Sequence, residues 1–242
     1  NHYLVADEVE ITDRSDEYAI VSIQGPKAEA LLRKLAGLSE LPTRPKQHAM
    51  VTIEGAAVCV VRDSDTGEPG FDLIIPRTHL FAIAKSLTAT GTSFGAAWVG
   101  EDAHNVLRIE AGVPRYGIDF SEDNLLLEVG IDHAVSFTKG CYLGQEVVER
   151  IRSRGHVNKR LVGLLVAGSD PVSAGDRIIA ADIEVGHLTS FAVSPALKQS
   201  IALGYIHKDF WNAGTRVVIR HNGERIDATI SDLPFVKTGQ PA

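Results

Sequence analysis

The feature that most constrains the fold is a series of short strand-like runs in the last third of the chain. Turn residues separate these runs closely, and Asn222-Gly223 is a hairpin signal. Such spacing predicts a small antiparallel barrel or sandwich. We therefore expect two domains, 1–157 and 158–242. The predicted strands are Leu161–Val166, Arg177–Ile179, Glu184–Ser190, Ile201–Tyr205, Arg216–Arg220 and Arg225–Ile230.

The first part of the chain mixes strand and helix patterns. The order is a strand, a helix opened by Pro26, a hairpin around Glu54-Gly55, a strand, and a helix that follows Pro76. This order predicts an α+β fold with helices on one face of a sheet. Cys59 falls among valines in a strand and is expected in the core. The expected segments are strands Glu17–Ile23, Ala49–Ile53, Ala56–Arg62 and Phe71–Ile75, a helix ending at Leu87, a linker at Thr88–Gly95, and a helix at Glu101–Ile109.

Composition excludes several classes of protein. No apolar run reaches the roughly 20 residues that a membrane span needs. The net charge of −7 argues against direct tRNA binding, and against nucleic-acid binding in general. The two cysteines, Cys59 and Cys141, provide neither a disulfide framework nor metal-ligand spacing, so we expect no metal site and a cytoplasmic location. Nucleotide-binding, hydrolase-elbow and zinc motifs are absent from the sequence.

A basic island interrupts this acidic chain at Lys139–Arg160. It contains six Lys or Arg residues against two Glu residues. A helix is predicted from Gln145 until Gly155 stops it. Arg150 and Arg154 share one face and suit an anionic group, but a solvated basic face explains them equally well.

Cys141 stands just before this predicted helix, between Gly140 and Gly144. The positive end of a helix and a nearby lysine stabilise a thiolate, which favours a reactive thiol. A small buried cysteine filling a tight turn explains the same position. Both interpretations stay open at this point.

A second candidate is the segment Leu107–Tyr116. Glu110 falls at a helix end before a Gly-x-Pro break, where a carboxylate can accept two parallel N–H bonds from an amino-pyrimidine. The alternative is a surface glutamate paired with Arg108 or Arg115. Tyr116 either stacks on a flat ring or packs, and a lone His104 is usually structural.

These segments together resemble a known family. RIEAGVPRYGIDF, followed by KGCYLGQEVVERIRSRG, resembles the YgfZ-type folate-binding proteins, relatives of the glycine-cleavage T protein (aminomethyltransferase). The likeness continues through VGHLTSFAVSPALKQSIALGYI and extends from Val5 to Lys237. The run around Cys141, Gln145 and Glu146 favours the YgfZ-type branch over T proteins.

The resemblance implies ferredoxin-like α+β subdomains that bind tetrahydrofolate, followed by a C-terminal β-barrel. It implies that Glu110 receives the pteridine ring, with Tyr116 near it and His104 at a position where relatives carry an aromatic residue. Arg150 and Arg154 would attract the anionic folate tail. Cys141 would be the functional cysteine, linked to iron–sulfur enzymes and, through them, to tRNA modification.

Two departures from the family pattern bear on function. The family normally has a further N-terminal subdomain, so we expect that subdomain to be missing from this sequence. The T-S-G of T proteins is T-S-F at Thr189–Phe191, which weakens the transferase interpretation. The expected function is maintenance of iron–sulfur client proteins with folate as cofactor. The alternative is an aminomethyltransferase that acts with a lipoyl carrier protein, so enzymatic activity stays open.

Overall fold

The computed structural model describes residues 9–37, 41–155, 157–168 and 172–237. The chain forms two compact units, one of Asn1–Ser64 with Glu68–Trp98 and one of Asp65–Gly67 with Val99–Ala242. The sequence placed a domain boundary near residue 157, whereas these units divide after Trp98. Among the described residues, no helix is long and apolar enough to cross a membrane.

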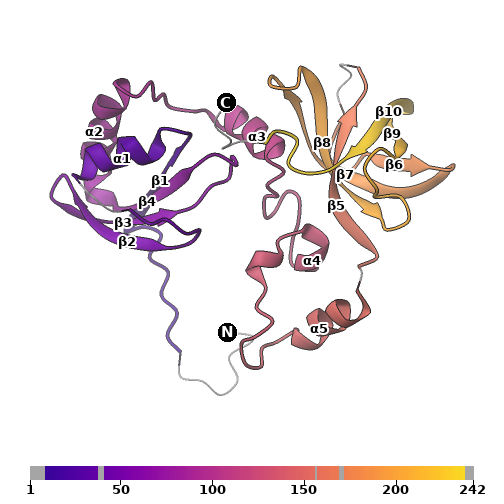
Figure 1. Cartoon of the computed structure of the whole chain (residues 1–242), viewed down its shortest axis with the longest axis horizontal. Helices are drawn as coiled ribbons and strands as arrows, with labels where there is room; N and C mark the ends of the chain where they lie inside the picture. Colours follow the sequence, from indigo (N-terminus) through magenta and orange to yellow (C-terminus); the bar gives the residue numbers. More distant parts are fainter. Residues whose placement is uncertain (1–8, 38–40, 156, 169–171, 238–242) are drawn as a thin grey trace. The chain divides into compact units, whose positions relative to one another are not determined.

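The first unit is an antiparallel sheet with helices packed against one of its faces (Figure 1). The strand order is β1-β4-β3-β2. The hairpin turn between β2 and β3 places Glu54 and Gly55 at positive φ, as a two-residue type I′ turn requires. The elements are β1 (Tyr18–Gln24), α1 (Ala28–Ala36), β2 (His48–Ile53), β3 (Ala56–Arg62), β4 (Gly70–Pro76), a 3₁₀ turn (Arg77–His79) and α2 (Leu80–Thr92).

Two predictions for this unit are wrong. The helix α2 continues into the expected linker as far as Thr92, because Ile83, Leu87 and Gly91 recur every four residues and are buried along one helix face. Cys59 is not a core residue. Its side chain is only partly buried, because it alternates with the inward-facing Val58 and Val60.

The second unit begins with α3 (Glu101–Glu110) and continues through two short turns of helix into α5. These turns are α4 (Leu126–Val129) and a 3₁₀ turn (Asp132–Ala134). The helix α5 (Gln145–Arg154) ends at Gly155, which adopts a left-handed conformation. The predicted basic helix therefore has the expected bounds.

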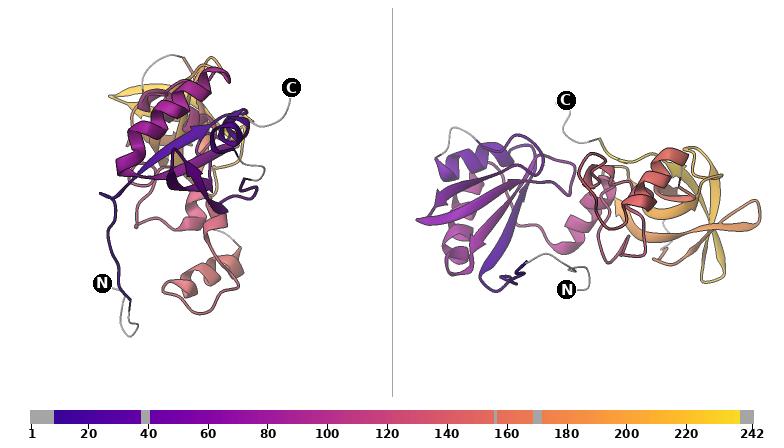
Figure 2. Two further views of the ribbon diagram at one scale, coloured as in Figure 1. Left: turned by 90° about the vertical axis from the view of Figure 1, so that its left-hand side faces the viewer. Right: turned by 90° about the horizontal axis from the view of Figure 1, so that it is seen from below.

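A closed antiparallel barrel completes the second unit, with strand order β10-β5-β8-β7-β6-β9 (Figure 2). The predicted barrel and the α+β fold class are both confirmed. Inward-facing aliphatic residues such as Leu164, Ile178 and Ile219 fill the barrel interior. The helix α3 packs on the outer face of β7 and β8. The strands are β5 (Lys159–Val166), β6 (Arg177–Ala180), β7 (Ile183–Ser194), β8 (Gln199–His207), β9 (Arg216–His221) and β10 (Glu224–Ser231).

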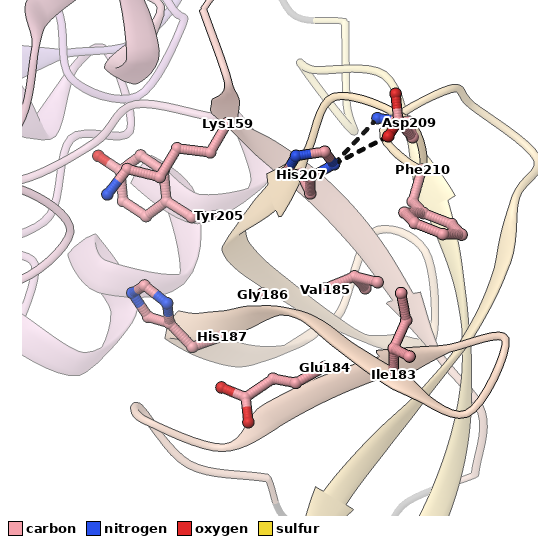
Figure 3. A pocket seen from close by; sticks show the side chains of 10 residues that line it. All are labelled: Lys159, Ile183, Glu184, Val185, Gly186, His187, Tyr205, His207, Asp209 and Phe210. Carbon is pink, nitrogen blue, oxygen red and sulfur yellow. Dashed lines mark hydrogen bonds and ion pairs between the residues drawn. The ribbon is translucent and has the colours of Figure 1, made fainter.

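A hollow of about 360 Å³ lies beside the start of β7 and the end of β8 (Figure 3). A second hollow, of about 300 Å³, lies where the turn that follows α3 meets the same two strands. His187 and Tyr205 line both hollows. Both depressions offer room for a ligand on the second unit.

Candidate functional site

The C-terminal end of α3 is buried and sharply terminated. Arg108, Ile109 and Glu110 are all buried, and the chain then turns at Gly112, whose φ is 69°. A Cβ at Gly112 would lie 2.9 Å from the side chain of Leu233. Glycine is needed here both for the left-handed backbone and for the close approach. The predicted helix stop at Ala111-Gly112 is thus confirmed.

Glu110 lies inside this junction. The residue is 7% exposed, and its Oε1 atom accepts a hydrogen bond of 2.5 Å from the hydroxyl of Ser194 on β7. The backbone N–H of Val236 donates to the Glu110 carbonyl. In the part of the chain that the structure describes, no side chain donates to Oε2 and no cation pairs with the carboxylate. A carboxylate has about four acceptor positions, so most of its hydrogen-bonding capacity is unused.

The alternative of a surface ion pair for Glu110 is wrong. Arg108 pairs with Asp119, and Arg115 pairs with Glu101. The carboxylate also does not project into open solvent. It is buried between α3 and the barrel wall because Ser194, distant in sequence, lies on the strand against which α3 packs.

A buried polar network lies next to Glu110. Arg108 is 3% exposed and Asp119 is 2% exposed, and their ion pair is 2.5 Å long. Asp119 also accepts hydrogen bonds from the hydroxyls of Thr189 and Ser190, each 2.6 Å, and from the backbone N–H of Arg115. Ser190 in turn accepts from the second guanidinium nitrogen of Arg108. A low-dielectric site makes such a network rigid once it is satisfied.

This network fixes the turn that carries Tyr116. The turn is closed by the N–H of Gly117 donating to the Phe120 carbonyl and by Asp119 binding back to Arg115. Tyr116 is 65% exposed, and its ring meets Phe120 edge-on with centroids 5.4 Å apart. The smaller hollow lies beside this turn, lined in part by Phe120. A flat ring therefore finds an exposed aromatic side chain and a depression on the same turn.

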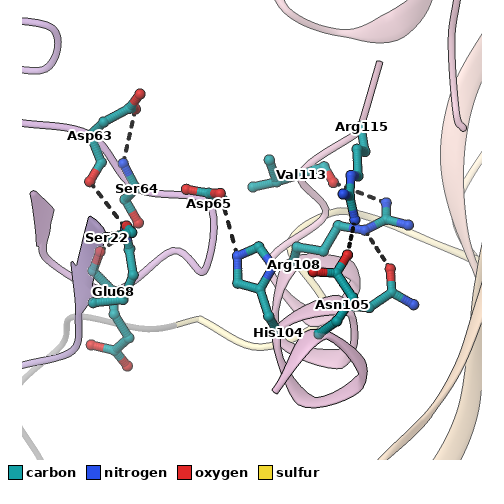
Figure 4. A network of polar contacts seen from close by, with 12 residues as sticks. Ser22, Asp63, Ser64, Asp65, Glu68, His104, Asn105, Arg108, Val113 and Arg115 are labelled. Atoms are coloured by element: carbon teal, nitrogen blue, oxygen red, sulfur yellow. Dashed lines mark hydrogen bonds and ion pairs between the residues drawn. The ribbon is translucent and has the colours of Figure 1, made fainter. Parts of the chain in front are cut away.

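His104 lies apart from Glu110. It is six positions earlier on α3, where its Nε2 is 3.3 Å from a carboxylate oxygen of Asp65, a residue of the same unit (Figure 4). Six residues correspond to roughly 9 Å along a helix and to a different face. Figure 4 also shows Arg108 binding Asn105 next to it. The structure gives His104 an ion-pairing partner rather than a position beside the Glu110 carboxylate.

Cys141 lies at the surface of the segment that precedes α5. The thiol is exposed and free, so the interpretation as a buried turn-filling residue is wrong. Lys139 places its amine 4.6 Å from the centre of the Tyr142 ring. The Tyr142 hydroxyl donates to the Ser136 carbonyl. Gly144, at φ 84°, starts α5 three residues after the thiol.

Two arginines of the basic island form ion pairs within its own helix. Arg150 binds Glu146, one turn earlier on the helix, at 2.6 Å, and Arg152 lies 3.6 Å from Glu149 and over the ring of Phe137. Exposed pairs of this kind contribute little to stability, but they reduce the net field of the helix. The side chain of Arg154 lies outside the described residues.

Sequence reasoning missed the residues that hold this site together, namely Arg108, Asp119, Ser190 and Ser194. A signal was available for Arg108. This arginine lies two positions before Glu110 on a helix that packs on a barrel, so its charge needs either a buried anion or solvent. The partners themselves come from β7 and could not be assigned without the fold.

Comparison with known proteins identifies the family. The GCVT N-terminal domain matches residues 1–139, and the glycine cleavage T-protein C-terminal barrel domain matches residues 159–237. The chain belongs to the glycine cleavage T-protein family. The family models thus account for the α+β part and the barrel, and the predicted superfamily is confirmed at this level.

Individual relatives of the T-protein family agree. An aminomethyltransferase from Caldanaerobacter subterraneus subsp. tengcongensis is 32% identical over 232 residues, which is 95% of this chain and 62% of that protein. One from Synechococcus elongatus is 32% identical over 235 residues, covering 96% and 61%. The crystal structure of glycine cleavage system aminomethyltransferase T from Bartonella henselae matches with a TM-score of 0.79 and 26% identity, covering 91% of this chain and 60% of that one.

This chain therefore spans about three fifths of the length of these relatives. Their names support the aminomethyltransferase alternative better than the iron–sulfur function that the sequence favoured. They provide no direct support for a YgfZ-type assignment. The buried Glu110 and its neighbouring turn belong to the matched part of the chain.

Proposed function

We propose that this chain binds tetrahydrofolate at the end of α3, as part of a folate-dependent aminomethyltransferase. The observation that carries the proposal is Glu110, a buried carboxylate whose side chain has only Ser194 as a hydrogen-bond partner among the described residues. Adjacent N–H groups of an amino-pyrimidine ring fit its unused acceptor positions. The relatives' name, aminomethyltransferase, supplies the reaction class.

The chain's own residues provide orientation. Ser194 holds one carboxylate oxygen of Glu110, which limits rotation of the carboxylate. The Arg108–Asp119 pair fixes the turn that presents Tyr116, so an aromatic face and an acceptor come from adjoining rigid segments. Tetrahydrofolate supplies the amine nitrogens that receive a one-carbon unit. Under this proposal an aminomethylated lipoyl carrier protein is the donor.

Calorimetric titration of the full-length protein with tetrahydrofolate tests the ligand. We expect Glu110→Gln to weaken binding by roughly 10- to 100-fold, because a charge-assisted hydrogen bond is lost and an amide N–H₂ faces the ligand's donors. Glu122→Gln is the matched control, since Glu122 is exposed on the turn region without a role in the proposed site. Equal affinities for wild type and Glu110→Gln would refute the proposal.

Release of ammonia from an aminomethylated lipoyl carrier protein in the presence of tetrahydrofolate tests the reaction class. If the full-length protein binds tetrahydrofolate but releases no ammonia, the proposed ligand stands and the proposed transferase activity is refuted.

A second candidate follows from the exposed, free Cys141 and the neighbouring Gln145-Glu146. We propose that, if the protein is of the YgfZ type, this thiol supports iron–sulfur client enzymes and through them tRNA modification in a reducing cytoplasm. Complementation of a deletion strain separates the two candidates. The second candidate requires Cys141→Ser to lose the client activities while tetrahydrofolate binding is kept, and full rescue by Cys141→Ser would exclude it.

A further inference from the structure

The hollow beside the start of β7 has a polar end and an apolar end (Figure 3). It contains neither Glu110 nor Tyr116, although it shares His187 and Tyr205 with the smaller hollow beside the Tyr116 turn. Lys159 and Tyr205 lie together at one end, and Phe210 and Ile183 lie at the other. A pocket with a few convergent polar groups beside apolar walls is the usual form of a small-molecule site.

Lys159 provides a cation at the polar end. Its amine lies 5.1 Å from the centre of the Tyr205 ring and 3.9 Å from a carboxylate oxygen of Glu128. The second distance is longer than a hydrogen bond, so the ammonium N–H donors are available to another acceptor. The lysine side chain is 42% exposed and is therefore accessible from the hollow.

Tyr205 adds a second donor at this end. The residue is 2% exposed, and its hydroxyl has no hydrogen-bond partner in the part of the chain that the structure describes. Burial, with the negative charges of Glu128 and Asp119, raises the pKa of Tyr205 to about 12. The hydroxyl is therefore protonated at neutral pH and can donate a hydrogen bond.

The remaining walls select the rest of the ligand. Ile183 is 56% exposed, and together with Val185 and Phe210 it forms an apolar surface. Burial, followed by the positive charge of Lys159, lowers the pKa of His187, so this ring is uncharged at pH 7. Two carboxylates also line the hollow, Glu184 and Asp209, and Asp209 lies 3.4 Å from the Nδ1 atom of His207. These carboxylates disfavour a second negative charge on the ligand.

We propose that this hollow binds a small organic monoanion, with one carboxylate group beside Lys159 and an apolar body against Ile183, Val185 and Phe210. The proposed ligand contacts do not include Glu110 or Tyr116, so the proposal can be tested apart from folate binding. Its ligand class follows from one accessible cation, a buried donor and a mostly aliphatic wall.

Titration of the full chain with 1-anilinonaphthalene-8-sulfonate, an aromatic monoanion, tests the site. We expect saturable fluorescence enhancement, with Lys159→Gln weakening the affinity about fivefold at low salt and less at high salt. Lys198→Gln, which removes the same charge from the exposed β7–β8 turn, leaves the affinity unchanged. Amide chemical shifts of Ile183–His187 should move during the titration.

A second variant guards against an effect on folding. Ile183→Asn alters an exposed wall residue rather than the barrel interior, and we expect it to weaken binding while the unfolding temperature is kept. Equal affinity of wild type and both variants, or chemical-shift changes confined to other surfaces, would overturn the proposal.

Discussion

The buried ion pair beneath the candidate site gives the sharpest stability prediction. Asp119→Asn keeps the shape of the side chain but leaves the Arg108 guanidinium, 3% exposed, without a counter-ion. Asp119 accepts four hydrogen bonds, two of them from Thr189 and Ser190, and an amide can accept only part of this set. Breaking a buried pair in this way costs about 3–5 kcal/mol, and we expect a value near the lower end because one acceptor oxygen remains.

Urea denaturation followed by tryptophan fluorescence measures this cost. Trp98 and Trp211 are the two tryptophans, and they lie in different compact units. In a Trp98→Phe background the signal reports Trp211 in the barrel unit, so that unfolding of the first unit does not distort the transition.

A double-mutant cycle isolates the pair itself. Removing the charge with Arg108→Met should recover part of the loss, so that the double variant is less destabilised than the sum of the single variants by about 2 kcal/mol. Additive single effects, or a loss below about 1 kcal/mol for Asp119→Asn, would refute the view that this network fixes the turn after α3.

Three further predictions concern the barrel. The pKa of His187 is lowered in the folded state, so the unfolded state takes up a proton first as the pH falls. The free energy of unfolding should therefore fall as the pH decreases through about 6.5, and His187→Gln should flatten this dependence in urea titrations between pH 7 and 5. An unchanged pH dependence in His187→Gln would contradict this prediction. Tyr205→Phe should remove the tyrosine that titrates at about 12 in absorbance spectra and should change stability by less than about 1 kcal/mol, since the hydroxyl has no partner within the described chain; a loss above 2 kcal/mol would show a missed hydrogen bond. Gly186→Ala should prevent normal barrel formation in circular dichroism and gel filtration, because its Cβ would lie 1.8 Å from the Tyr205 carbonyl oxygen, whereas Gly100→Ala, with open space around it, should fold normally.

The barrel was predictable because its signals are local. Runs of β-branched residues and turn pairs such as Asn222-Gly223, both at positive φ, specify short strands without knowledge of the partner strand. The end of α2 was not predictable in this way. Thr88 has a weak helix propensity, but the burial of Leu87 and Gly91 on the packed face holds this stretch in the helix.

The candidate site was predicted in part. The helix stop after Glu110 follows from Gly112 and Pro114, which are local signals. The burial of Glu110 depends on Ser194, 84 residues later, and the burial of Arg108 depends on Asp119. Such contacts arise from the packing of α3 on β7, and no pattern within either segment encodes them.

A structure of the full-length protein with tetrahydrofolate tests the central claim most directly. We predict that the pteridine ring lies with its amino group and an adjacent ring N–H within about 3 Å of the Glu110 carboxylate, while Ser194 keeps its hydrogen bond. A pteridine bound elsewhere, with Glu110 contacting only Ser194, would contradict the account.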